Sequence, residues 1–199
     1  VQRLIDGIAR YSEEIHTESQ PLFDDLAEGQ SPDVLFLTCA DSRVDPSLIT
    51  QTKPGEIFVC RNAGNIVPPS DAGLAADGMA ASIEFAVKAL QVADIVVCGH
   101  ADCGAVKGAM APESIEPLPY VGAWLQYADH GGKQDLDEAI EANVLAQLDH
   151  LRTYEFINEA IANGSLTLSG CVYDIGSGLV RVYDGTDFVV PTRPTESSS

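Results

Sequence analysis

Basic residues are scarce in this 199-residue chain: 11 lysines and arginines stand against 30 aspartates and glutamates, giving a formal net charge of -19. A surface with this charge repels nucleic acid and anionic membranes, so we expect neither as a partner. The acidic residues are spread along the chain, which is typical of a solvated acidic surface. Because only four residues are lysine, we add the hypothesis that the surface is adapted to high salt.

Long apolar runs are also missing. No stretch approaches the roughly 20 residues that are needed to cross a bilayer. The amino-terminal sequence VQRLIDGIARYSEEIH lacks the basic, apolar and small-residue layout of a secretory signal. Five cysteines are an odd number and do not suggest a disulfide framework. We therefore expect a protein of the reducing cytoplasm.

The pattern of apolar residues predicts strands and helices within one domain, which suits a chain of this length. Short apolar runs at 34–37 and 95–99, each bounded by turn residues, are typical of buried parallel strands. Further strands are expected at 56–60, 166–173 and 179–183, and helices at 2–17, 21–28, 73–90, 105–110, 119–130 and 134–163, the last range broken near residue 154.

Residues of the types that bind metals follow the strands expected at 34–37 and 95–99. Cys39 opens the sequence CADSR, and His100 and Cys103 lie in HADCG. In open α/β sheets the chemistry gathers at the carboxyl ends of strands, so we expect these side chains to meet. Thiolates together with an imidazole select zinc. The fourth ligand is either Asp41 or a solvent molecule, since Arg43 can pair with Asp41 and leave the metal open to water.

The other cysteines and histidines have simpler interpretations. Each such residue taken alone is more often a core or surface residue than a ligand. We expect core packing for Cys60, Cys98 and Cys171, which lie within apolar runs. We expect His16, His130 and His150 at the surface or at helix ends, and nothing in the sequence selects one of them as a proton shuttle.

Three motifs, CADSRVDP, RNAGNIVPP and HADCGAVKG, resemble in their order and spacing the signature of the β-class carbonic anhydrases. The similarity extends from about residue 4 to residue 190. It implies an α/β fold with a mostly parallel central sheet flanked by helices, in one domain over residues 1–194. It also implies a helical arm at 1–28 for dimerisation and a homodimer or higher homo-oligomer. The serine-rich end of the sequence separately predicts a disordered tail at 195–199. The cytoplasm stays the expected location, with a carboxysome or another compartment left open.

The resemblance also implies roles for individual residues. One zinc ion per chain is bound by Cys39, His100 and Cys103, beside a catalytic pair formed by Asp41 and Arg43. The implied substrate-binding positions are Gln30, which reaches across the dimer interface, and Phe58, Ala63, Phe85 and Gly104.

Two positions depart from patterns found among members of the family. Phe85 stands where some members carry a tyrosine, so a hydroxyl is missing there. Some members also have an inhibitory bicarbonate site, to which Arg61 and Tyr173 correspond. The tryptophan of that site is Phe36 here, so we do not expect the inhibitory site in this chain.

The implied reaction is the zinc-dependent, reversible hydration of carbon dioxide to bicarbonate and a proton by attack of zinc-stabilised hydroxide. Two thiolates donate more charge to the metal than imidazoles do, so we expect more activity at alkaline pH. One alternative is hydrolysis of carbonyl sulfide or carbon disulfide by the same nucleophile. Another is an inactive zinc-stabilised scaffold or a shell-associated interaction protein, which a fourth protein ligand on the zinc would favour.

Overall fold

The computed structural model describes residues 1–72 and 78–192. The expected tail at 195–199 and the first five residues of the helix expected at 73–90 lie outside the described residues. The chain divides into two units, Val1–Ser31 and Pro32–Ser199, and each is described by itself. No helix among the described residues has the length and apolar character needed to span a bilayer.

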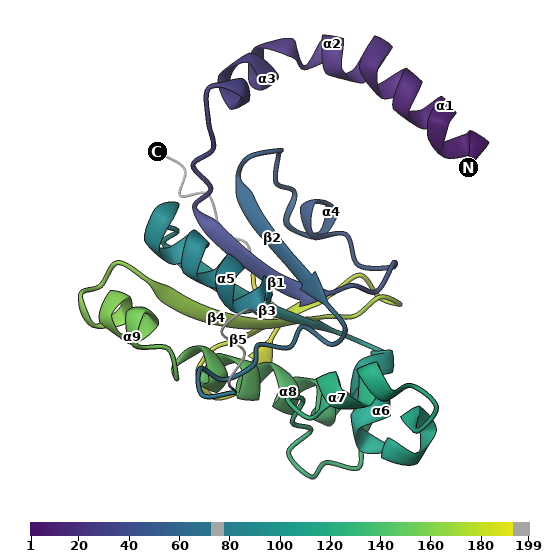
Figure 1. Ribbon diagram of the computed structural model, residues 1–199, viewed down its shortest axis with the longest axis vertical. Coiled ribbons are helices and arrows are strands. Elements are labelled where there is room, and N and C mark those ends of the chain that lie inside the picture. The colour runs from purple at the N-terminus through teal and green to yellow at the C-terminus, as the bar shows by residue number, and fades with distance from the viewer. Residues whose placement is uncertain (73–77, 193–199) are drawn as a thin grey trace. The chain divides into compact units, whose positions relative to one another are not determined.

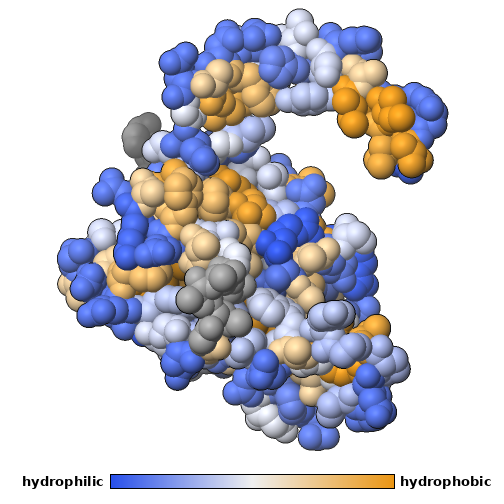
Figure 2. Space-filling model, in the orientation of Figure 1, coloured by the Kyte–Doolittle hydropathy of each residue, from blue (hydrophilic) through white to orange (hydrophobic). Residues whose placement is uncertain are grey.

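The first unit is helical, as expected. It consists of α1 (Gln2–Arg10), a π-helical turn at Tyr11–Ile15, α2 (His16–Glu18) and α3 (Gln20–Ala27). Pro21 lies in the first turn of α3, where its missing N–H costs no hydrogen bond. The apolar stripe of α1 is exposed, with Leu4 70% and Ile8 66% accessible, and Figure 2 shows apolar side chains gathered on this segment.

The second unit is built on a six-stranded sheet with the order β2-β1-β3-β4-β5-β6 (Figure 1). The first four strands in this order are parallel, and the last two join antiparallel. The expected hairpin of the last two long strands is confirmed. Their bounds are β1 Val34–Cys39, β2 Ile57–Asn62, β3 Asp94–His100, β4 Thr167–Tyr173, β5 Val180–Tyr183 and β6 Phe188–Val189.

Two details of the strand prediction were wrong. Strand β2 continues through Arg61 and Asn62, which the turn-rich sequence had placed in a loop, because both residues pair with the end of β1. The short strand β6 was not expected. Its two residues pair only with β5, and so short a stretch has no readable alternation.

Helices connect the strands and cover the sheet. They are α4 (Pro46–Thr50), α5 (Gly78–Glu84) with a π-helical turn at Phe85–Ala89, α6 (Gly104–Met110), a 3-10 turn at Pro112–Ile115, α7 (Pro119–Leu125), α8 (Leu136–Leu151) and α9 (Glu155–Ala162). The Asp135 carboxylate accepts the N–H groups of Asp137 and Glu138 and so caps the start of α8. The break expected near residue 154 separates α8 from α9.

Helix α8 packs closely on one face of the sheet. Its residue Val144 is fully buried in the main core, together with Leu35 and Val97 of the strands. A Cβ atom at Gly99 would lie 2.8 Å from Val144 Cγ2, and one at Gly170 would lie 2.9 Å from Val144 Cγ1. Both distances are too short for any side chain, so these two glycines set how near α8 lies to β3 and β4.

The opposite face of the sheet has a smaller core. Phe36, Cys98 and Cys171 are buried there, with half-buried apolar residues of β2, β3 and β5 around them. An apolar groove of about 400 Å³ runs along this face and is lined in part by Phe36, Cys171 and Val182. Cys60 is buried in the main core. The prediction that these three cysteines pack in the core is therefore confirmed.

Candidate metal centre

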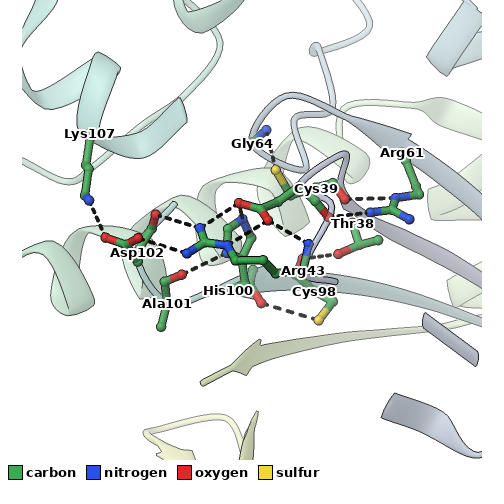
Figure 3. Close-up of polar contacts among 12 residues, drawn as sticks. Thr38, Cys39, Arg43, Arg61, Gly64, Cys98, His100, Ala101, Asp102 and Lys107 are labelled. Atoms are coloured by element: carbon green, nitrogen blue, oxygen red, sulfur yellow. Dashed lines mark hydrogen bonds and ion pairs between the residues drawn. The ribbon is translucent and has the colours of Figure 1, made fainter. Parts of the chain in front are cut away.

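The ends of two neighbouring strands bring three metal-binding side chains together. Cys39 is the last residue of β1, His100 is the last residue of β3, and Cys103 is the N-cap of α6. One ligand atom from each residue lies within 4.8 Å of the others, and all three residues are buried. The geometry expected from strand ends is thus present. Figure 3 shows Cys39 and His100 with the polar contacts around them.

The His100 ring has the tautomer that a metal-bound imidazole requires. His100 Nδ1 lies 2.8 Å from the Ala101 carbonyl oxygen, which assigns the ring proton to Nδ1. Its buried Nε2 has no hydrogen-bond partner within the described part of the chain, so its lone pair is available. Such an N–H to carbonyl bond is typical of metal-bound histidines.

The two thiols fit a shared cation. The neighbouring Cys103 thiol has the largest effect on Cys39 and, together with the nearby His100 ring and the Gly64 N–H, lowers the pKa of Cys39 to about 4. The Cys39 thiolate in turn raises the pKa of Cys103 far above its usual value. Both thiols ionise together only when a positive ion compensates their charge, and Zn²⁺ bound by sulfur and nitrogen does so.

Asp41 is held beside this cluster by Arg43. Arg43 donates from Nε to Asp41 Oδ1 at 2.9 Å and from Nη2 to Oδ2 at 2.7 Å, and its backbone N–H donates to Oδ1 at 2.9 Å. These bonds keep the pKa of Asp41 well below its usual value. Asp41 Oδ2 lies 3.8 Å from His100 Nε2, so an ionised carboxylate stands next to the metal position while its oxygens are bound to a guanidinium.

Arg61 supports the turn that carries Asp41. From β2 it donates Nε to the Cys39 carbonyl at 3.0 Å and Nη2 to the Asp41 carbonyl at 2.7 Å. The sequence related Arg61 only to an inhibitory anion site and did not reveal this structural contact. Phe36, the residue in place of that site's tryptophan, is buried in the smaller core with Tyr173 packed against it.

The expected substrate positions fall into two groups. Ala63 and Gly104 adjoin the cluster, because the neighbouring Gly64 donates its N–H to Cys39 Sγ at 3.4 Å and Gly104 follows Cys103. The Phe58 ring lies 6.1 Å from the Phe85 ring. On β2, Phe58 pairs with Leu35, whereas Asn62, four residues later, pairs with Cys39. Phe58 therefore lies about 13 Å along the strand from the level of Cys39. The phenylalanine pair is therefore not beside the cluster of its own chain.

Gln30 belongs to the first unit, Val1–Ser31, and is exposed there. The resemblance implies that it contacts substrate across a dimer interface. That role therefore stays a prediction.

Comparisons with known proteins agree with this geometry. A family model described as carbonic anhydrase matches residues 34–180, which include the whole Cys–His–Cys cluster. The solved structure of the β-carbonic anhydrase CcaA superimposes with a TM-score of 0.89 at 41% identity, covering 96% of this chain and 98% of that one. The chain belongs to the β-carbonic anhydrase family.

Individual relatives extend the match over nearly the whole chain. A carbonic anhydrase of Synechocystis sp. is 43% identical, covering 96% of this chain and 74% of the relative. One from Pseudomonas aeruginosa is also 43% identical, covering 92% of this chain and 87% of its own. Two tetrameric β-carbonic anhydrases from Sordaria macrospora have been solved, with a TM-score of 0.74 at 30% identity over 92% of this chain and 96% of theirs.

This β-carbonic anhydrase is thus a zinc enzyme that hydrates carbon dioxide reversibly to bicarbonate and a proton. The α/β fold with its mostly parallel sheet and amino-terminal helical segment, expected from the resemblance, is confirmed.

A buried polar network behind the metal centre was not foreseen. Asn143 and Gln147 of α8 are 1% and 0% exposed. Asn143 Nδ2 donates to the Gly64 carbonyl at 3.1 Å, and Gln147 Oε1 accepts the Val67 N–H at 2.8 Å. His150 Nδ1, one turn further, lies 2.8 Å from the Val67 carbonyl. The network therefore holds the loop whose Gly64 N–H binds the Cys39 sulfur.

Proposed function

We propose that Cys39, His100 and Cys103 bind one zinc ion per chain and that Asp41 and Arg43 form the catalytic pair. The observation that carries this assignment is the buried Cys–His–Cys cluster with an arginine-held carboxylate 3.8 Å from the imidazole. When bound, zinc supplies a Lewis acid that makes hydroxide available from water near neutral pH.

The protein's own residues orient the reaction. Asp41, kept ionised by Arg43, accepts the hydrogen bond of the attacking water or hydroxide and turns its lone pair toward carbon dioxide. Because both carboxylate oxygens of Asp41 are bound by Arg43, the carboxylate would stay off a metal held by the two cysteines and the histidine, and solvent could take the remaining position. A new carbon–oxygen bond gives bicarbonate, and the released proton passes to buffer.

The substrate pocket is proposed to form between two copies of the chain. Ala63 and Gly104 line it from the chain that supplies the zinc ligands, while Gln30, Phe58 and Phe85 are contributed by the other copy. The separation of Phe58 from its own cluster and the 48% exposure of Phe85 support this arrangement.

We propose a homodimer as the basic unit, with a single domain over residues 1–194 and residues 1–28 as the dimerisation arm. The exposed apolar stripe of α1 and the apolar groove along the sheet are surfaces that a second copy would bury. The tetrameric relatives make a higher oligomer a natural extension. Sedimentation of the Ile8→Glu variant should show dissociation toward monomer, and an unchanged species would contradict the role of the arm.

Two properties of the surroundings complete the proposal. A reducing cytoplasm suits five free, buried cysteines. Titration of the denatured protein should find five thiols after purification under reducing conditions. The count should be the same after anaerobic purification without reductant. The formal charge of -19 supports adaptation to salt.

The Asp41→Asn variant tests the catalytic assignment. It should retain zinc and lose most carbon dioxide hydration, because an amide donates a hydrogen bond where the carboxylate accepts one. Asp187→Asn, which removes an exposed carboxylate of the β5–β6 turn, is the matched control and should keep full activity. Full activity of Asp41→Asn would refute the role of Asp41. Release of sulfide from carbonyl sulfide at a rate above that of hydration would favour the alternative substrate.

A further inference from the structure

A second carboxylate lies on the far side of Arg43, within the turn between His100 and Cys103. Arg43 Nη1 donates to Asp102 Oδ2 at 3.1 Å, and Lys107 donates to Asp102 Oδ1 (Figure 3). We propose that Asp102, itself held by Lys107, is a positioning residue that fixes the Arg43 guanidinium and through it the orientation of Asp41. The inference rests on the proposed catalytic pair and concerns how that pair is held.

The donors of Arg43 are divided between the two carboxylates. Nε and Nη2 face Asp41, whereas Nη1 faces Asp102, and Nη2 also reaches the Asp102 carbonyl oxygen at 3.4 Å. A guanidinium is planar and rigid, so contacts on two of its edges fix the plane of the whole group. Asp41 alone would contact one edge only and would leave the group free to rotate.

Exposure explains why a second contact is needed. The Asp41 side chain is only 17% accessible, but that of Arg43 is 43% accessible. A solvent-exposed ion pair with a single partner gains little, because water competes and the long side chain loses conformational freedom. With Asp102 on its outer edge, Arg43 is bound from both sides, and its two bonds to Asp41 keep their geometry.

The backbone of Asp102 is consistent with a directed role. Its φ of +61° lies in the left-handed region, which few residues other than glycine adopt. Aspartate and asparagine tolerate it best, and such conformations gather at functional sites, where the surroundings hold them. Here the turn joins His100, the last residue of β3, to Cys103, the N-cap of α6. Asparagine therefore keeps the shape of the turn while it removes the charge.

Lys107 completes a chain of alternating charges. It lies on α6, five residues after Asp102, and the order Asp41, Arg43, Asp102, Lys107 alternates in sign throughout. The Asp102 side chain is 56% accessible, so without Lys107 it too would be held from one side only. Removing the lysine charge should therefore weaken the same contact, but less than removing the carboxylate charge does.

The test compares Asp102→Asn and Lys107→Met with the zinc-loaded parent protein. Glu138→Gln is the control, because it removes a carboxylate charge from another exposed ion pair, with Lys133. Three quantities are measured: zinc content, kcat/KM of carbon dioxide hydration at high buffer concentration, and solvent exchange of the Arg43 Nε–H by ¹⁵N NMR. High buffer keeps proton removal from limiting the rate.

We expect kcat/KM of Asp102→Asn to fall about tenfold, the lower end for groups that hydrogen-bond to metal-site residues. Zinc content should be unchanged, and exchange of the Arg43 Nε–H should be faster by a similar factor. Lys107→Met should change both quantities in the same direction but by less. Glu138→Gln should match the parent protein.

Three results would overturn the proposal. The first is unchanged kcat/KM in Asp102→Asn, and the second is reduced kcat/KM in that variant with unchanged exchange of the Arg43 Nε–H. The third applies if Asp102→Asn loses zinc, and it is unchanged exchange of the Arg43 Nε–H in Lys107→Met. A parent protein that is fully loaded with zinc and yet inactive would instead refute the proposed catalytic pair. The NMR comparison would still report whether Asp102 holds Arg43.

Discussion

Replacement of Asn143 by alanine should destabilise the protein because three hydrogen bonds of one buried side chain are lost at once, two of them to buried residues. The partners are the Gly64 carbonyl at 3.1 Å, the Asp129 N–H at 3.2 Å and Gln147 Nε2 at 3.1 Å. Asn143 is 1% exposed, so water does not easily replace the amide. At about 1 kcal/mol for each bond lost in a buried setting, the free energy of unfolding should fall by about 3 kcal/mol.

Urea denaturation of the zinc-loaded protein measures this loss. All variants are compared at one protein concentration, because zinc binding and association both contribute to apparent stability. Asn158→Ala is the matched control. Asn158 is exposed on α9 and donates one bond, to the Arg152 carbonyl at 2.6 Å, so its loss should be about 1 kcal/mol or less.

The same variant should also release zinc to a chelator faster than the parent protein. The Gly64 carbonyl that Asn143 holds belongs to the residue whose N–H binds Cys39 Sγ. If Asn143→Ala loses no more stability than Asn158→Ala, the buried network does not support the loop as argued. If stability falls but zinc release is unchanged, the network does not extend to the metal centre.

Other predictions follow from separate features. Cys39→Ala should abolish zinc retention in metal analysis. In the metal-free parent protein, thiolate absorbance at 240 nm should persist as the pH falls to about 4, since the Cys39 pKa is lowered to that value, and this last step should be missing in Cys39→Ala. Gly170→Ala should cost about 1–3 kcal/mol by overpacking against Val144. Gly176→Ala, whose nearest neighbour would be 3.4 Å away, should cost almost nothing in the same denaturation assay. Thermal midpoint and activity should rise with added salt up to the molar range, and no gain in either would remove the salt hypothesis.

The strand ends that build the metal centre could be predicted from the sequence. Short apolar runs directly before Cys39 and His100 place both residues at the same edge of a parallel sheet, and this inference needs no knowledge of side-chain contacts. The Asp41–Arg43 contact was equally local, since two residues separated by one position share a side of an extended turn.

The supporting contacts were harder to predict because they join distant segments. Asn143 and Gln147 form a polar pair four residues apart on a helix that is otherwise apolar on that side, and this signal was present in the sequence. Their partners in loop 64–67 lie some 80 residues earlier, so the pattern alone does not reveal what they bind. For Gln30 and the Phe58–Phe85 pair, the proposed partner is a second copy of the chain, and a pattern within one sequence does not show where that copy lies.

The closeness of Cys39 and Cys103 has a consequence for how the enzyme is handled. Sulfur atoms that share one cation become, once that cation is removed, a pair of neighbouring thiols within 4.8 Å of each other. Dissolved oxygen or a small disulfide can oxidise such a pair to a protein disulfide, which no longer binds metal. Stripped enzyme left in air should therefore fail to regain zinc until a reductant is added, whereas loaded enzyme should keep well.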